Sequence, residues 1–386
     1  MQKVKNRYKP VRLFANKKDR FRAANRRYMY KLYKIINNDS QPSQIPSVAF
    51  YPTGSLVAVA YLHNNQIKIF DTENGELTKR YENPDAQLDH PHGVVVTDNH
   101  IIVSNKHDPA NKPSTFNVYS LKTSSCRPVN IFNTPLDYLR EAHSLSYNKG
   151  RLVVTYCNGI KPSVLSYHFD DDTGQISGPI DIVEDCLLDL GKDVKGITFN
   201  SSGDKVLVSF VTEKSLTIKY IFLELARYLK DAKGLKRLIQ RRIERIYKVF
   251  NRPKYTNKKD NNSSNGIAEF LIDEHGKMSS NPIHVRQEEA YCRMENISLV
   301  DDLLTVSDPV NNSVKIFSFD EFDSSNKALF EINEGLHFPH DASISKDKTT
   351  LAVVNHGIEV LDNHPRWGKF LTPRQDKLHI YRFRSR

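Results

Sequence analysis

A six-fold repeat of short β-type runs is the feature that most constrains this chain of 386 residues. In each repeat a short apolar run leads through a polar turn to a second apolar run, and a third run follows. The first repeat shows the template, with runs at 47–50, 56–60 and 66–71 and a turn at Pro52-Thr53-Gly54. Short runs bounded by Gly, Asp, Asn and Ser turns are typical of β-strands. A period of about 45–50 residues with four strands per unit predicts an all-β fold, a six-bladed β-propeller.

The sixth repeat predicts how the ring closes. Arg386 comes directly after the third run of this repeat, so its fourth strand must come from elsewhere. Residues 31–36 precede the first repeat just as the other fourth strands precede the next repeat. We therefore predict that an N-terminal strand closes the propeller, since closure removes free sheet edges. The expected domains are a basic N-terminal arm at 1–30 and a propeller at 31–386, with a helical insertion at 213–265 in blade four.

The basic residues gather in two segments outside the repeats. Residues 1–36 hold 13 Lys or Arg and one acidic residue, and residues 215–254 hold 12 and three. Because the whole chain has a net charge of +11, the remainder is acidic. Apolar residues from Leu223 to Phe250 recur at helical spacing beside this charge. The insertion is predicted to be a lid over the propeller or a contact with an anionic membrane surface or an acidic protein, in preference to a nucleic acid.

The sequence predicts a cytoplasmic protein, either free or peripheral to the membrane. No stretch of 18 apolar residues is present that would span a bilayer. The basic N-terminus is not followed by the apolar region of a secretory signal. The four cysteines form no CxxC pair, which favours reduced thiols; they are Cys126, Cys157, Cys186 and Cys292.

One position recurs where the first run of each repeat begins, and it holds residues typical of a chemical site. If the repeats are blades, this position starts the innermost strand, and all six copies converge on the propeller axis. In chain order the six residues are Pro46, His92, His143, Lys195, Glu295 and His340. The sequence therefore predicts that three imidazoles and a carboxylate meet on the axis.

Imidazole nitrogens and a carboxylate are ligands typical of borderline divalent ions. We predict that His92, His143, Glu295 and His340 bind Zn, Fe, Mn or Cu, with open positions for a substrate. Two alternatives stay open, which are a polar lining around water and a metal-free acid–base site. Lys195 argues against a fully occupied metal shell, and we expect it to hold an anionic substrate or to neutralise Glu295.

The second runs end on the same predicted face as these residues. They contribute His107 and His356, which we expect to transfer protons together with Lys195 as the catalytic groups. The predicted reaction is hydrolysis or elimination of a small, anionic molecule, in which a metal polarises a carbonyl or activates water. The alternative is a non-catalytic scaffold whose basic segments bind an acidic partner or a membrane surface.

The repeats also resemble a known group of proteins. The segments from Phe50 to Ala60 and from Gln66 to Asp71 resemble repeats of lactonase-like, NHL-type and strictosidine-synthase-like propellers. The resemblance covers residues from about 40 to 386 without the insertion. It implies the fold, and it is compatible with metal-containing lactonases and lyases as well as with pure interaction modules. No catalytic motif matches residue by residue, so no residue role is carried over from these families.

Overall fold

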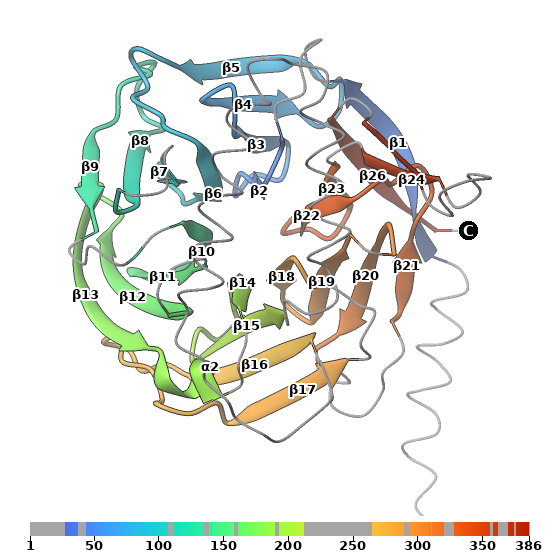
Figure 1. Ribbon diagram of the computed structural model, residues 1–386. Helices are drawn as coiled ribbons and strands as arrows, with labels where there is room; N and C mark the ends of the chain where they lie inside the picture. The colour runs from blue at the N-terminus through green and yellow to red at the C-terminus, as the bar shows by residue number, and fades with distance from the viewer. Residues whose placement is uncertain are drawn as a thin grey trace, which may run out of the picture.

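Six four-stranded antiparallel sheets stand around a central axis in the computed structural model of the chain (Figure 1). The expected six-bladed β-propeller is therefore confirmed. The structure describes residues 28–37, 44–106, 112–134, 139, 141–157, 161–189, 193–211, 265–288, 294–309, 311–319, 328–355, 358–361, 370–373 and 376–385.

Each blade runs from an innermost to an outermost strand. Blade one has β2 (Val48–Phe50), β3 (Leu56–Tyr61), β4 (Gln66–Asp71) and β5 (Leu77–Glu82). Blade two has β6 (Pro91–Val96), β7 (His100–Asn105), β8 (Thr115–Ser120) and β9 (Asn130–Asn133). Blade three has β10 (Ala142–Asn148), β11 (Arg151–Tyr156), β12 (Ser163–Asp170) and β13 (Gln175–Val183).

Blades four to six repeat this order. Blade four has β14 (Asp193–Phe199), β15 (Lys205–Val211), β16 (Asn265–Leu271) and β17 (His284–Glu288), and blade five has β18 (Asn296–Val300), β19 (Leu303–Asp308), β20 (Ser313–Ser318) and β21 (Phe330–Ile332). Blade six has β22 (Pro339–Ile344), β23 (Thr350–Asn355), β26 (Lys377–Ser385) and β1 (Tyr28–Asn37). A short hairpin of β24 (Ile358–Leu361) and β25 (Phe370–Pro373) and the helix α2 (Asp185–Asp189) lie between these strands in the sequence.

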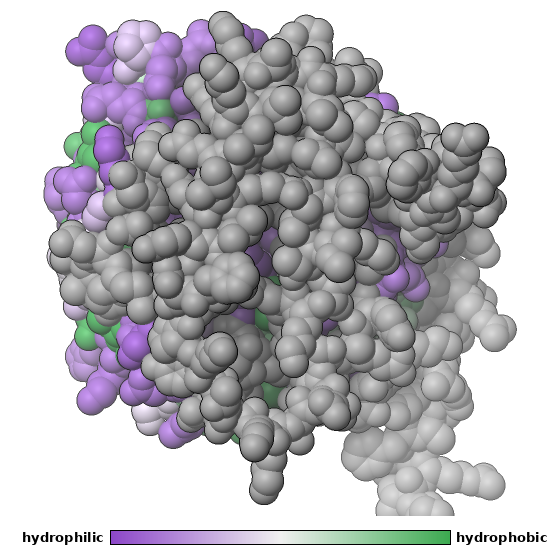
Figure 2. All heavy atoms as spheres, viewed as in Figure 1, coloured by the Kyte–Doolittle hydropathy of each residue, from purple (hydrophilic) through white to green (hydrophobic). Residues whose placement is uncertain are grey.

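Apolar side chains fill the space between neighbouring blades. The middle strands read as nearly continuous apolar runs because both of their faces are covered by other blades. Ile102 and Phe116 of blade two, for example, share one buried cluster with Leu152 of blade three. The outermost strands are more exposed, and in β9, for example, half-buried and fully exposed residues alternate. Figure 2 accordingly shows mainly hydrophilic residues along the left edge of the ring, over β9 and β13.

The closing strand is β1, and it confirms the predicted N-terminal closure. It pairs with β26 in antiparallel register from Tyr28↔Ser385 to Asn37↔Lys377, and it begins three residues before the predicted 31. Tyr30 anchors the strand, because it is buried in the apolar cluster between blades five and six and its hydroxyl donates a 2.7 Å hydrogen bond to the Lys348 carbonyl. Blade six is thus built from both ends of the chain.

The predicted insertion at 213–265 falls almost wholly outside the described residues, as does most of the basic arm at 1–30. The third strand of blade four, β16, begins at Asn265. Within the described part of the chain, no helix has the length and apolar character that crossing a bilayer requires.

Hydroxyl groups on second strands tie each of three blades to the next around the axis. Ser104 Oγ donates to the Ala142 carbonyl at 3.1 Å, Thr155 Oγ1 to that of Lys195 at 2.6 Å, and Ser307 Oγ to that of His340 at 2.8 Å. Each acceptor is at or next to an axial position of the following blade. These bonds fix the innermost strands relative to one another.

Gly196 is predicted to be intolerant of a side chain, because β14 passes very close to β18. A Cβ added there would lie 2.5 Å from the Ile297 nitrogen, which is rigid backbone. We expect Gly196→Ala to lower the free energy of unfolding by about 3 kcal/mol, as overpacking does. Urea unfolding measures this change. Gly93→Ala is the matched control, since its Cβ would meet its neighbours at 3.0 Å or more; an equal loss in both variants would contradict the argument.

His379 in β26 is expected to make the fold sensitive to acid. Burial, and then Lys377 and His337, lower the pKa of this histidine to about 4, and its side chain is only 1% exposed. The unfolded chain therefore takes up this proton near pH 6.5, so stability is complete above that pH and falls as the pH drops towards 4. The expected loss is about 3 kcal/mol. Urea unfolding at pH 7 and pH 4 should show a shallower pH dependence in His379→Gln than in the exposed control His275→Gln; equal slopes would refute the assignment.

Candidate metal site on the propeller axis

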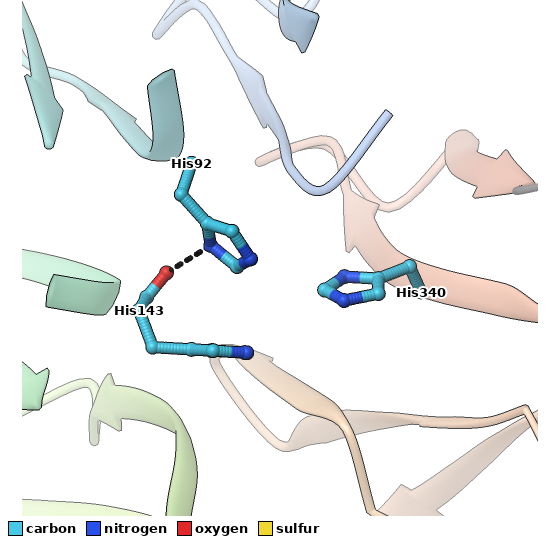
Figure 3. Close-up of side chains that lie close together, drawn as sticks. All are labelled: His92, His143 and His340. Atoms are coloured by element: carbon cyan, nitrogen blue, oxygen red, sulfur yellow. Dashed lines mark hydrogen bonds between the residues drawn. The ribbon is translucent and has the colours of Figure 1, made fainter. Parts of the chain in front are cut away.

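Three histidines from three blades meet on the axis. His92 lies in β6, His143 in β10 and His340 in β22, and their rings point toward one another (Figure 3). One ring nitrogen of each lies within 4.8 Å of those of the other two. The three residues are 4%, 3% and 4% exposed. The structure therefore brings together the three imidazoles that the repeat predicted.

A β-bulge aims each of these side chains at the axis. The pairing of the innermost strand with the second strand shifts register between Pro91 and Val94, between Ala142 and Ser144, and between Pro339 and Asp341. The histidine lies inside each of these irregularities, where a residue is freed from the ladder and its side chain is redirected. Blade four has the same shift between Val194 and Ile197, around Lys195.

A left-handed residue precedes the bulge by a fixed distance. His90, Glu141 and Phe338, each two residues before an axial histidine, have φ angles of 55°, 58° and 62°. Gln44 has the same backbone, with a φ of 52°, two residues before Pro46. Since Pro46 has no ligand side chain, this backbone belongs to the repeat and not to the histidines. The bend turns the chain from the loop into the innermost strand.

Backbone carbonyls fix the tautomers of two histidines. His92 Nδ1 lies 2.7 Å from the His143 carbonyl oxygen, and His340 Nδ1 lies 2.7 Å from that of Pro46. A carbonyl only accepts, so both Nδ1 atoms carry the proton and donate it. In the neutral rings the lone pair is then on Nε2. Such an arrangement is the usual support for a metal-binding histidine.

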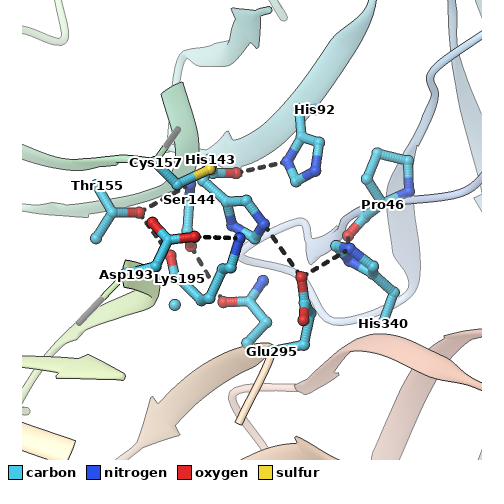
Figure 4. A network of polar contacts seen from close by, with 12 residues as sticks. Pro46, His92, His143, Ser144, Thr155, Cys157, Asp193, Lys195, Glu295 and His340 are labelled. Carbon is cyan, nitrogen blue, oxygen red and sulfur yellow. Dashed lines mark hydrogen bonds and ion pairs between the residues drawn. The ribbon is translucent and has the colours of Figure 1, made fainter. Parts of the chain in front are cut away.

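Glu295 brings a carboxylate to the same cluster (Figure 4). Its Oε1 lies 3.4 Å from Nε2 of His143 and 3.4 Å from Nε2 of His340, and the residue is 2% exposed. Because Nδ1 of His340 donates to the Pro46 carbonyl, the neutral form of this ring would turn a lone pair toward this oxygen, and two lone pairs repel. A proton or a metal cation between the atoms removes that repulsion. The carboxylate predicted for the site is therefore in place beside two of its imidazoles.

Burial disfavours the protonated form of two of the imidazoles, those of His92 and His143. It is the main cause that holds the pKa of His92 well below its usual value, and the charge of Lys106 adds to it. Burial also lowers the pKa of His143, against an opposing hydrogen bond to Glu295. His143 Nδ1 is buried and has no hydrogen-bond partner among the described residues. A neutral imidazole is the form that binds a metal.

The remaining predicted residues are placed as follows. Lys195 lies beside the cluster, where its charge lowers the pKa of His143, and its Nζ is 3.1 Å from Asp193 Oδ2. His107 and His356 lie outside the described residues. The sequence reading missed Asp193, although it comes two residues before an axial position.

Comparison with known proteins identifies the fold and no family. No protein-family model matches the sequence, and no curated protein matches it. Among the similar solved structures is a luciferin-regenerating enzyme, with 9% identity and a TM-score of 0.53 over 92% of this chain and 95% of that one. Another is a chain from a mitotic checkpoint complex, with 10% identity and a TM-score of 0.52 over 99% and 96%. Identities this low show the fold alone, and they agree with the propeller resemblance seen in the sequence.

Proposed function

We propose that the axial cluster binds a divalent transition-metal ion and that the protein is a metal-dependent hydrolase or lyase for a small molecule. The convergence of His92, His143 and His340, with two tautomers set by carbonyls, carries this proposal. Three imidazoles suit Zn, Fe, Mn or Cu, in keeping with the preferences of these ions for nitrogen ligands. A fourth position is then left for water or substrate.

Glu295 supports a cation at this place. Its Oε1 lies 3.4 Å from Nε2 of both His143 and His340, so a cation between these atoms would be held by oxygen and nitrogen together. Glu295 either completes the ligand set or accepts a proton from the reacting molecule as a general base. A bound ion would polarise a carbonyl or activate water. As a metal ligand or as a general base, Glu295 would use its buried carboxylate oxygens.

Lys195 and Asp193 form the second polar group of the proposed site. Their ion pair and the effect of Lys195 on His143 support a role for Lys195 in moving a proton to or from a bound molecule, with Asp193 setting its orientation. His107 and His356 keep their proposed roles in proton transfer. The competing function is a non-catalytic scaffold, and one structural neighbour does belong to a protein assembly, the mitotic checkpoint complex.

Metal analysis of protein purified without a histidine tag tests the proposal. We expect about one equivalent of a single transition metal, and a panel of ester, lactone and elimination substrates should show turnover that a chelator abolishes. Less than about a tenth of an equivalent, unchanged after incubation with Zn, Fe, Mn or Cu, would refute the metal site. A metal-loaded protein without turnover on any substrate would favour the scaffold.

A further inference from the structure

Side chains that lie directly before the third strand of one blade hold the entry of the next blade. Three of them are Asn65, Ser114 and Asn312. A side-chain oxygen of each accepts a hydrogen bond from a backbone N–H in the following blade. In chain order the donors are His90 at 2.7 Å, Ala142 at 2.9 Å and Phe338 at 2.8 Å. Each donor lies one or two residues before an axial histidine, so a bond of this kind precedes each of the three histidines of the proposed metal site.

Two of these donors have a backbone conformation that needs support. His90 and Phe338 have φ angles of 55° and 62°, in the left-handed region that residues other than glycine seldom adopt. Such a conformation persists where the surrounding structure holds it. The residue before each of them is held as well, by an asparagine that ends the second strand of the same blade. The bonds run from Asp89 N to Asn105 Oδ1 at 3.1 Å and from His337 N to Asn355 Oδ1 at 2.7 Å. Side-chain amides thus fix two successive residues on the way into each of these two axial histidines.

The axial position of blade four, which holds Lys195, is reached differently. Asp193, two residues before it, is already paired with Val211 in the sheet of that blade. The residue directly before the third strand of the preceding blade is Pro162, which has no side-chain acceptor. The supporting oxygen is therefore present at the entries of the three histidines and absent where a lysine takes their place.

Blade one extends the pattern to a carbonyl group. Asp376 directly precedes β26, and its Oδ2 accepts a 2.7 Å hydrogen bond from the backbone nitrogen of Gln44. Gln44 lies two residues before Pro46, which has no ligand side chain but whose carbonyl accepts the Nδ1 proton of His340. This entry therefore also serves a histidine of the site.

We propose that Asn65, Ser114 and Asn312 are positioning residues of the metal site. Each holds the backbone from which one histidine projects, so the imidazole nitrogens need little rearrangement to bind an ion. Ligands whose positions are fixed in advance bind more tightly, because less conformational freedom is lost on binding. This inference rests on the proposed metal site and adds the residues that prepare it for the ion.

Titration of the full chain with Co²⁺, followed by visible absorption, tests the assignment. Asn65→Gly and Asn312→Gly remove the acceptor at positions with φ angles of 52° and 51°, which glycine adopts without strain. We expect each to weaken Co²⁺ binding about 10-fold, the lower end of the effect of a supporting residue, and to change the absorption band of the bound ion. Ser114→Ala should act in the same way. Asn312→Asp keeps the acceptor oxygen and should restore most of the affinity.

Asn200→Ala is the matched control. Asn200 Oδ1 accepts the backbone N–H groups of Gly203 and Lys205, each at 3.0 Å, in the turn after β14 and away from the axial end of that strand. This variant should be less stable in urea and bind Co²⁺ like the wild type. If the wild type binds Co²⁺, unchanged affinity and absorption in Asn65→Gly and Asn312→Gly, or an equal loss in Asn200→Ala, overturns the inference alone. A wild-type protein that binds no Co²⁺ refutes the proposed function and this inference with it.

Discussion

Replacing His340 by alanine is expected to reduce metal affinity at least 100-fold. The substitution removes one of the three imidazole ligands. It also removes the hydrogen bond to the Pro46 carbonyl that orients the His340 ring. Loss of a supporting partner alone costs 10- to 100-fold in metal sites, so loss of a ligand costs more. The measurement is competition with a chromogenic chelator, read together with elemental analysis. Protein that retains bound metal after dialysis against the chelator would contradict the prediction.

The control must separate the loss of a ligand from general destabilisation. His275 is an exposed histidine in the turn before the outermost strand of blade four, so His275→Ala should leave metal content unchanged. A metal that binds only the folded state stabilises it by about 4 kcal/mol at 1,000 times its dissociation constant. Added metal should therefore raise the melting temperature of wild type and of His275→Ala, and it should not raise that of His340→Ala.

Removal of residues 1–37 is expected to abolish soluble folding. The deletion takes away β1 and leaves β26 as a long unpaired edge, which invites aggregation. It also uncovers the buried cluster between blades five and six to which Tyr30 belongs, and removes the contact of its ring with Phe330. The measurement is soluble yield, followed by thermal unfolding of any soluble fraction. A truncated protein that is soluble and melts like the full chain would refute the closure.

A shorter truncation controls for the loss of the basic arm. Removing residues 1–27 leaves the whole of β1 in place, so this protein should fold. A synthetic peptide with the sequence of residues 28–37, added during refolding, should raise the soluble yield of the longer truncation. Recovery with a scrambled peptide would show that the effect comes from charge or solubility and not from strand pairing.

The fold was predictable because its signal is repeated along the chain. The same succession of short apolar runs and polar turns occurs six times. The blades can therefore be recognised even where a single strand, such as β2, is only three residues long. The closing strand was also predictable, since blade six lacked a fourth strand and 31–36 stood in the matching place. The insertion at 213–265 remains a prediction, because its interpretation rested on one helical pattern outside the described residues.

The site was predictable in part. The six axial residues occupy equivalent positions in the six repeats. Aligning the repeats with one another was therefore enough to identify them. The bulges that aim His92, His143 and His340 could not be foreseen, because no residue type marks them.

Blade six both closes the ring and supplies one of the three axial histidines. Its outer strands, β26 and β1, form the seam between the two ends of the chain, and its innermost strand, β22, supplies His340. An ion held by His92, His143 and His340 would connect this blade directly to blades two and three. Like a disulfide, the ion would join segments that are distant in the sequence. It would hold the C-terminal part of the chain, which carries His340, to the N-terminal part, which carries His92 and His143. Metal binding on the axis and the free energy needed to detach β1 from β26 are then thermodynamically linked.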